Sequence, residues 1–355
     1  MSVYIQSASH ISIQEPLSEK WFTEPQIPEE NFNLSIEPDY KQFIAPIEAR
    51  RMGKLLKRAV TTSADALRKG GCEMPDAIIT GTGLGCIENT EKFLNAMLDN
   101  DEECMPPTAF MQSTHNTISS QVALTLKCHG YNCTYSQQGF SFDSALLDAF
   151  MQFQLGRIGT ALVEGHDEMS PDYYRMLGKI GYWKKEAANT EILREGCGVG
   201  SISGSSSVAI LLSNKLNNNT LCEIKNIITL HCPDNSEIKT ALENLLSESG
   251  ITMNDIDAIV TGLSGDEAND AVYKEVAANC FNGKPLVWYK HIFGESFCAS
   301  AFGIYIGATI ISKGFIPEHL LYKSEKEIKN VSNILIYNHF QNKNHSLTLL
   351  QTVKG

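Results

Sequence analysis

The sequence can fold around a large core, because 43% of its 355 residues are hydrophobic and only 20% are charged. Its formal net charge of -12 argues against a protein that binds nucleic acid through a basic surface. The length exceeds what a single small core supports, which favours two domains or one large α/β unit.

The N-terminus and the apolar segments indicate a protein that stays in the cytoplasm. Residues 1–14 contain no basic stretch followed by an apolar core. The apolar run at 297–312 is shorter than the roughly 20 residues that cross a bilayer. Ten cysteines show neither CxxC nor zinc-finger spacing, so we expect no metal site and mostly packed, inert thiols.

Hydrophobic spacing and turn residues predict a succession of strands and amphipathic helices. In chain order, the predicted elements are a strand at 3–5, a helix at 55–69, a strand at 76–81, a helix at 142–154, strands at 160–163 and 206–212, a helix at 238–249, a strand at 257–262, and a strand pair at 333–337 and 346–350 around a polar turn at 341–344.

An internal repeat organises these elements. Residues 76–81 read Asp-Ala-Ile-Ile-Thr-Gly and residues 257–262 read Asp-Ala-Ile-Val-Thr-Gly. A predicted helix that ends at glycine precedes each copy, and such a succession is half of a crossover in a parallel α/β layer. The repeat therefore predicts a duplicated α/β fold. The alternative is a chance match between two buried strands, which draw on the same few residue types.

Residues 130–156 resemble the nucleophile segment of the β-ketoacyl synthases, a family with the thiolase fold. There, a strand leads to a sharp turn that carries the reactive cysteine, and a long buried helix follows. The scaffold positions of that pattern are matched at Gly130, Asn132, Ala149 and Leu155-Gly156.

The resemblance extends over most of the chain. Residues 160–168 are similar to a strand that ends in a Gly-rich acidic loop, and residues 255–270 and 290–302 are similar to the family's two histidine segments. It implies an α/β, thiolase-like duplicated αβαβα layered fold, with an N-terminal half at 1–204 and a C-terminal half at 205–355.

The residues that carry the family's chemistry are missing. In the matching register the cysteine falls on Gly139, beside Gln138, the first histidine falls on Gly262 and the second on Glu295, whereas Lys290 is kept. Decarboxylative condensation needs a thiolate to hold the acyl chain and two imidazoles to stabilise the enolate. The resemblance therefore implies a catalytically degenerate ketosynthase with no intact catalytic residue.

For several of these residues, two interpretations of their role stay open. Gln138 either fills the vacated nucleophile space or belongs to an ordinary polar turn. Lys290 either faces the pocket or extends to the surface. His115 and Asn116 lie in a segment that runs along the dimer interface in family members, but these residue types also suit a helix cap. Cys133 fits a packed core thiol better than a nucleophile.

Two glycine-rich loops and one acidic loop raise the question of a cofactor. The loops 81–85 and 196–200 lack the lysine of a phosphate-binding loop and the acidic partner of a dinucleotide site. Residues 164–168 have metal-ligand side chains, but adjacent residues rarely converge on one ion, and the resembling family loop holds no metal. We therefore expect neither a cofactor nor a metal.

The resemblance implies a chain-length-factor-like subunit in fatty-acid or polyketide-type biosynthesis. Such a subunit pairs with an active ketosynthase, here through 115–120 and 131–135, and shapes the cavity for the growing chain. Among ketosynthases, a short and degenerate chain of this type resembles the accessory ketosynthases of aryl polyene and flexirubin-type pathways. Acyl carrier proteins are acidic, so a chain with a net charge of -12 would meet one only indirectly.

Two alternatives stay open. One is an active acyltransferase or condensing enzyme that uses an unconventional nucleophile, such as Cys133 or Cys197. The other is a homodimer that acts as a scaffold for an acyl carrier protein.

Overall fold

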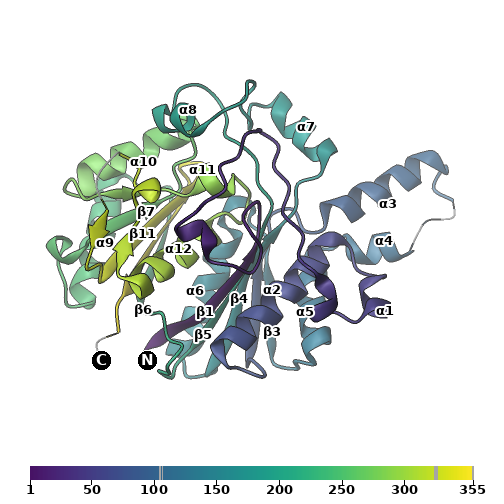
Figure 1. Cartoon of the computed structure of the whole chain (residues 1–355), viewed down its shortest axis with the longest axis horizontal. Helices are drawn as coiled ribbons and strands as arrows, with labels where there is room; N and C mark the ends of the chain where they lie inside the picture. The colour runs from purple at the N-terminus through teal and green to yellow at the C-terminus, as the bar shows by residue number, and fades with distance from the viewer. Residues whose placement is uncertain (104, 106, 324–326, 354–355) are drawn as a thin grey trace.

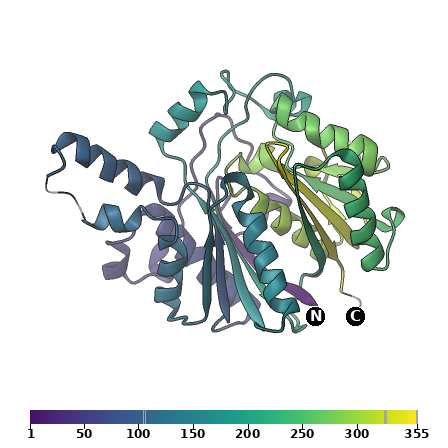
Figure 2. The same cartoon turned by 180° about the vertical axis from the view of Figure 1, so that it is seen from behind.

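The computed structural model describes residues 1–103, 105, 107–323 and 327–353, and a ten-stranded mixed sheet runs through its centre (Figures 1 and 2). Its strands are β1 (Val3–Ile11), β2 (Ala77–Gly81), β3 (Tyr131–Tyr135), β4 (Thr160–Asp167), β5 (Ser206–Ser213), β6 (Cys222–His231), β7 (Ala258–Thr261), β8 (Leu286–Val287), β11 (Asn333–Phe340) and β12 (Asn344–Gln351). Two short strands, β9 (Phe315–Ile316) and β10 (Ile328–Lys329), form a separate pair.

The strand order confirms the duplicated α/β fold. The order is β3-β2-β4-β5-β1-β6-β12-β11-β7-β8. Outward from the centre, both five-strand units therefore run first, fifth, fourth, second, third. The parallel and antiparallel pairings also correspond between the units. The two copies of the repeat fall on β2 and β7, with Thr80 and Thr261 buried at equivalent ends.

The two units meet at the β1–β6 pair, where Val3 to Ile5 bond to β6. Strand β5 pairs with β1 and β4 and so belongs to the first unit. The chain therefore passes from the first unit to the second between Ser213 and Cys222. The division predicted from the sequence, at 204/205, assigns β5 to the C-terminal half instead. A division into two domains stays a prediction.

Helices form three layers with the two units of the sheet between them (Figures 1 and 2). Helices α2 and α5 cover the first unit, α9 and α10 cover the second, and α6 and α12 pack between the units. Helix α12 is buried along nearly its whole length, as its uniformly apolar sequence requires. The helices are α1 (Pro46–Ala49), α2 (Lys54–Gly70), α3 (Ile87–Asp99), α4 (Pro107–Gln112), α5 (Thr117–Leu126), α6 (Ser141–Gln154), α7 (Pro171–Lys179), α8 (Thr190–Glu195), α9 (Asn235–Glu248), α10 (Glu267–Cys280), α11 (Lys290–Phe293) and α12 (Ser300–Lys313). Short 3-10 turns are η1 (Lys20–Phe22), η2 (Tyr40–Gln42), η3 (Gln138–Phe140), η4 (Met253–Asp255) and η5 (Glu318–Leu320).

Several strands, among them β1 and β11, are longer than hydrophobic spacing predicts, and buried polar side chains continue these two. In β1, Ser7 Oγ donates to the Ala66 carbonyl at 2.6 Å and Ser9 Oγ donates to Asp65 at 2.6 Å. Strand β11 continues past Tyr337 to Phe340 in the same way. Hydrogen bonds to distant elements make these polar residues suitable for the core.

Among the described residues, no helix combines the length and the apolarity that a bilayer span needs.

Candidate functional site

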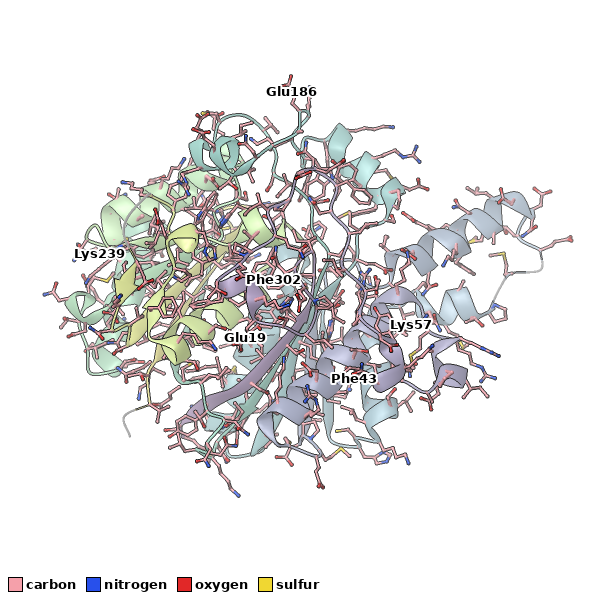
Figure 3. All side chains as sticks on the ribbon, viewed as in Figure 1. Glu19, Phe43, Lys57, Glu186, Lys239 and Phe302 are labelled. Carbon is pink, nitrogen blue, oxygen red and sulfur yellow. The ribbon has the colours of Figure 1, made fainter. Side chains whose placement is uncertain are left out.

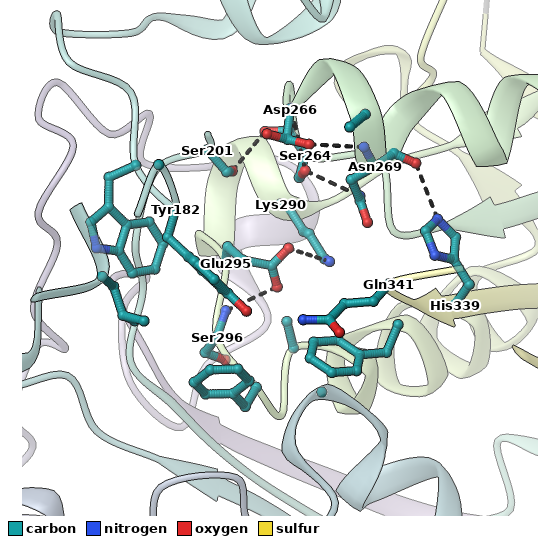
Figure 4. A pocket seen from close by; sticks show the side chains of 18 of the residues that line it. Tyr182, Ser201, Ser264, Asp266, Asn269, Lys290, Glu295, Ser296, His339 and Gln341 are labelled. Carbon is teal, nitrogen blue, oxygen red and sulfur yellow. Dashed lines mark hydrogen bonds and ion pairs between the residues drawn. The ribbon is translucent and has the colours of Figure 1, made fainter. Parts of the chain in front are cut away.

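A cavity of about 600 Å³ opens between the two units of the fold (Figure 4). Tyr182 and Trp183 line one wall, from the segment between α7 and α8. The start of α10 and the tip of the β11–β12 hairpin line another. Gly139, Lys290 and Glu295, three of the residues selected from the sequence, all lie in this lining. The cavity combines a mostly apolar wall with a few converging polar groups, as small-molecule sites do.

A sharp turn connects β3 to α6 beside this cavity. Gln138 has a φ of 52°, a left-handed conformation that is uncommon for a residue other than glycine. Ser141 Oγ fixes the turn, because it accepts the Gln137 N–H at 2.8 Å. Gly139 follows, and a Cβ there would stand 2.3 Å from the Phe340 ring. The geometry therefore places Gln138 at the tip of the turn and requires glycine next to it.

Lys290 and Glu295 form an ion pair in the cavity wall, with Lys290 Nζ 2.6 Å from Glu295 Oε2. The side chains are 7% and 22% exposed. Glu295 also accepts the Ser296 N–H at 3.1 Å. Burial raises the pKa of the Glu295 carboxyl, and the Lys290 charge opposes that rise. Lys290 thus faces the cavity, and the interpretation as a surface lysine is wrong.

Gly262 lies behind the lining. A Cβ at this position would meet Tyr273 Oη at 2.3 Å. That hydroxyl donates to Asn338 Oδ1 at 3.0 Å and accepts the His339 N–H at 3.2 Å. A tyrosine from α10 therefore occupies the space that a side chain at 262 would need.

His339 lines the cavity but was not selected from the sequence, where it lies between the predicted strand at 333–337 and the polar turn at 341–344. The ring is 4% exposed. Nδ1 accepts the Asn342 N–H at 3.3 Å, so Nε2–H donates to the Asn269 carbonyl at 3.1 Å. Burial lowers the pKa of His339 to about 3, so the ring is neutral. The sequence signal for a strand over this histidine is weak, because the apolar run ends at Tyr337 and only Phe340 resumes it.

Asp143 is a second residue that sequence reasoning missed. It lies in the first turn of α6 and accepts hydrogen bonds from Ser346 Oγ at 2.5 Å and Asn338 Nδ2 at 3.2 Å. Burial raises the pKa of its carboxyl, and these hydrogen bonds oppose the rise. Asp143 therefore ties α6 to the hairpin that lines the cavity.

The glycine-rich loop at 81–85 binds a carboxylate of the chain itself. Asp167 accepts hydrogen bonds from Thr82 Oγ1 at 3.0 Å, Gly83 N at 3.0 Å and Leu84 N at 2.8 Å. In the loop at 196–200, Gly198 N and Gly200 N likewise donate to carboxylates at the start of α10. The backbone donors that would hold a phosphate are thus engaged.

Glu168, at the end of the acidic loop, is buried beside the first turn of α3 and accepts the Glu88 N–H at 3.1 Å. Burial, and then the Glu88 charge, raise its pKa from 4.5 to about 7. The folded protein therefore keeps a proton that the unfolded chain loses between these values, so this group lowers the free energy of unfolding as pH rises through that window.

As the pH is raised from about 4 to about 8, the free energy of unfolding of Glu168→Gln should increase by about 3 kcal/mol relative to that of the wild type. Glutamine keeps the acceptor oxygen and removes the titration. Urea unfolding at both pH values measures the difference. Glu186→Gln, at an exposed position, is the control (Figure 3). A stability difference that does not change with pH would contradict the assignment.

The remaining selected residues lie outside the cavity lining. Cys133 is half-buried on β3, and Cys197 is exposed, with its thiol 3.8 Å from the Glu195 carbonyl oxygen. His115 and Asn116 are exposed before α5, and the Asn116 side chain makes no capping hydrogen bond. Cys104 lies outside the described residues.

Comparison with known proteins gives one family and many similar structures. The family model for the β-ketoacyl synthase N-terminal domain matches residues 19–190. The ishigamide ketosynthase/chain length factor is 17% identical, with a TM-score of 0.82 over 99% of both chains. A β-ketoacyl synthase from Burkholderia phymatum STM815 is 13% identical, with a TM-score of 0.81 over 99% of this chain and 100% of that one.

A third similar structure, AntDE:AntF, is a type II polyketide synthase acyl-carrier protein in complex with its ketosynthase bound to the hexaketide. It is 12% identical, with a TM-score of 0.76 over 99% of both chains. No curated protein sequence matches the chain. At these identities, the structural likeness shows the thiolase-like fold.

Proposed function

We propose that the chain, whose residues 19–190 match the β-ketoacyl synthase N-terminal domain, is a catalytically degenerate member of that family, a chain-length-factor-like subunit that pairs with an active ketosynthase. The observation that carries the proposal is the chemistry of the cavity. Gly139, which lines the cavity, stands where the family pattern has the cysteine, beside Gln138 at the tip of the turn, and a carboxylate, Glu295, lies in the wall.

These side chains do not suit a condensation reaction. A carboxamide at Gln138 cannot form a thioester, and Gly262 leaves its space to Tyr273. An ionised Glu295 would oppose the negative charge that develops on an enolate, where the reaction needs hydrogen-bond donors. The imidazole of His339 is engaged at both nitrogens. We treat Gly139, Gly262 and Glu295 as vestigial positions, with Gln138 and Lys290 adjacent to them.

The first unit offers a surface for the partner. Strand β3 is at the edge of the ten-stranded sheet, and no strand among the described residues pairs with its outer side. Exposed apolar side chains lie on the neighbouring elements, with Leu124 74% exposed on α5 and Met111 62% exposed on α4. An edge strand presents unpaired N–H and C=O groups that can pair with a strand of another chain. The chain is similar in structure to the ishigamide ketosynthase/chain length factor, and we propose that it pairs with a ketosynthase through β3 and residues 115–120.

The test is activity with and without the partner. Incubated alone with malonyl- and acyl-loaded carrier protein, the protein should remain unacylated and release no carbon dioxide above background. Mixed with the intact ketosynthase of its own pathway, it should form a heterodimer and support turnover. An acyl group on Cys133 or Cys197 of the isolated protein would favour the unconventional nucleophile, and carrier-protein binding by a homodimer alone would favour the scaffold.

We propose an aryl polyene or related pathway, which an intact ketosynthase gene beside this one would support.

Filling the cavity should change the product. Val272 on α10 lines the cavity and is partly exposed, so tryptophan there adds volume without entering the core. If the growing chain enters this cavity, Val272→Trp should shorten the products of the heterodimer without abolishing turnover, and Val272→Ala should not shorten them. Gly139→Trp is a poorer choice, because its side chain would displace Phe340. Mass spectrometry of the products measures the chain length, and unchanged lengths for Val272→Trp would contradict a role for this cavity.

A further inference from the structure

A thiol, an imidazole and a carboxamide lie in a row at the end of β6, outside the cavity lining. Cys232 Sγ is 3.6 Å from His231 Nε2, and His231 Nδ1 is 2.9 Å from Asn344 Oδ1. Cys232 and His231 are exposed, and Asn344 is partly exposed. A nucleophile within reach of a base, with a third group that orients the base, is the arrangement that activates cysteine.

The strand pairing fixes this arrangement. Asn344 on β12 is the register partner of His231, and the Cys232 N–H donates to the Lys343 carbonyl at 2.5 Å. Because the Asn344 oxygen can only accept, His231 carries its hydrogen on Nδ1. The lone pair of Nε2 therefore faces the thiol and can take its proton.

The surrounding backbone decides which electrophile suits the thiol. Attack on a thioester would form an oxyanion that needs free N–H donors. The N–H of Cys232 is bonded to Lys343, that of Asp234 to Glu237, and those of Ser236 and Glu237 to Asp234. Attack on a disulfide sulfur forms no oxyanion, so these engaged donors do not hinder it.

We propose that Cys232 is an exchange site for small-molecule disulfides, with His231 as its base and Asn344 as the positioning residue. His231 Nε2 takes the thiol proton, and the Cys232 sulfur attacks one sulfur of the disulfide. The sulfur–sulfur bond breaks and a mixed disulfide forms on Cys232. The departing thiolate then takes the proton from His231, and the disulfide is the oxidant.

Oxidised glutathione is the probe for the test. The native protein is exposed to a limiting amount, quenched with acid, and the mixed disulfides are quantified by peptide mass spectrometry. Cys197, also exposed, is the internal reference. Cys232 should react at least about tenfold faster than Cys197, since a positioned base accelerates thiol deprotonation. His231→Gln should bring Cys232 down to the rate of Cys197 and leave Cys197 unchanged.

The role of Asn344 has its own readout. Asn344→Ala should slow Cys232, and Asn344→Asp should restore the rate, because a carboxylate also accepts the Nδ1 hydrogen. Melting temperatures verify that the variants fold. Equal rates at Cys232 and Cys197, or no effect of His231→Gln, would overturn the proposal. So would faster transfer to Cys232 from acetyl-N-acetylcysteamine than from the disulfide, which would make the site an acyl acceptor.

Discussion

Replacing Glu295 by alanine should lower the free energy of unfolding by about 3–5 kcal/mol, because it leaves the Lys290 ammonium unpaired in the cavity wall. Lys290 is 7% exposed, and Glu295 Oε2 at 2.6 Å is the acceptor of its hydrogen bond. Removing one member of a buried pair costs more than the pair contributes, because the remaining charge keeps its desolvation cost. Urea unfolding of the two proteins measures the loss.

The double variant Lys290→Met/Glu295→Leu is the matched control. Replacing both charges by apolar groups of similar size is often nearly neutral, so this variant should recover most of the lost stability. A Glu295→Ala variant within about 1 kcal/mol of the wild type would mean that water or another group compensates Lys290. The role assigned to the pair would then be wrong.

Thr134→Pro should weaken binding to the ketosynthase partner by roughly 10- to 100-fold, since proline removes one ladder donor and a partner carbonyl left unsatisfied costs about 1–3 kcal/mol. On β3, the Tyr131 N–H bonds to Asp76 and the Tyr135 carbonyl bonds to Thr82, both toward β2. Alternate residues of a strand face opposite neighbours, so the N–H of Thr134 faces the free edge. Proline removes that donor and leaves the β2–β3 ladder intact.

Thr134→Val is the control, because valine keeps the backbone N–H and changes only the side chain. It should bind the partner nearly as the wild type does. Surface plasmon resonance with the immobilised ketosynthase compares the three proteins. Binding of Thr134→Pro at wild-type affinity would exclude β3 from the interface and leave the exposed side chains of α4 and α5 as the remaining candidates.

The sequence predicted the layered fold because its repeat and its hydrophobic runs are local features. Residues 76–81 and 257–262 fall on equivalent strands. The predicted helix at 55–69 is one residue shorter than α2 at each end, and the one at 142–154 begins one residue after α6. The longer strands were missed because their polar residues are stabilised by partners far away in the sequence, such as Asp65 for Ser9.

The site was only partly predictable for the same reason. Matching to the family pattern placed Gly139, Lys290 and Glu295 in one cavity lining. It could not find that Tyr273 occupies the space beside Gly262, because that contact depends on how α10 packs against β11. Likewise, Cys232 and His231 look like ordinary loop residues until the β6–β12 pairing brings Asn344 beside them.

The position of β1 constrains the order of folding during synthesis. This first strand lies in the middle of the sheet, and Tyr4 pairs with Ser213, so the ribosome releases β1 long before its neighbour. Contacts between such distant segments carry a large loop-closure cost and form slowly. The first unit therefore closes only after β5 has emerged, and until then the apolar edges of β1 and β4 lack their partner. A nascent chain with such unpaired edges is therefore exposed to aggregation until β5 has been synthesised.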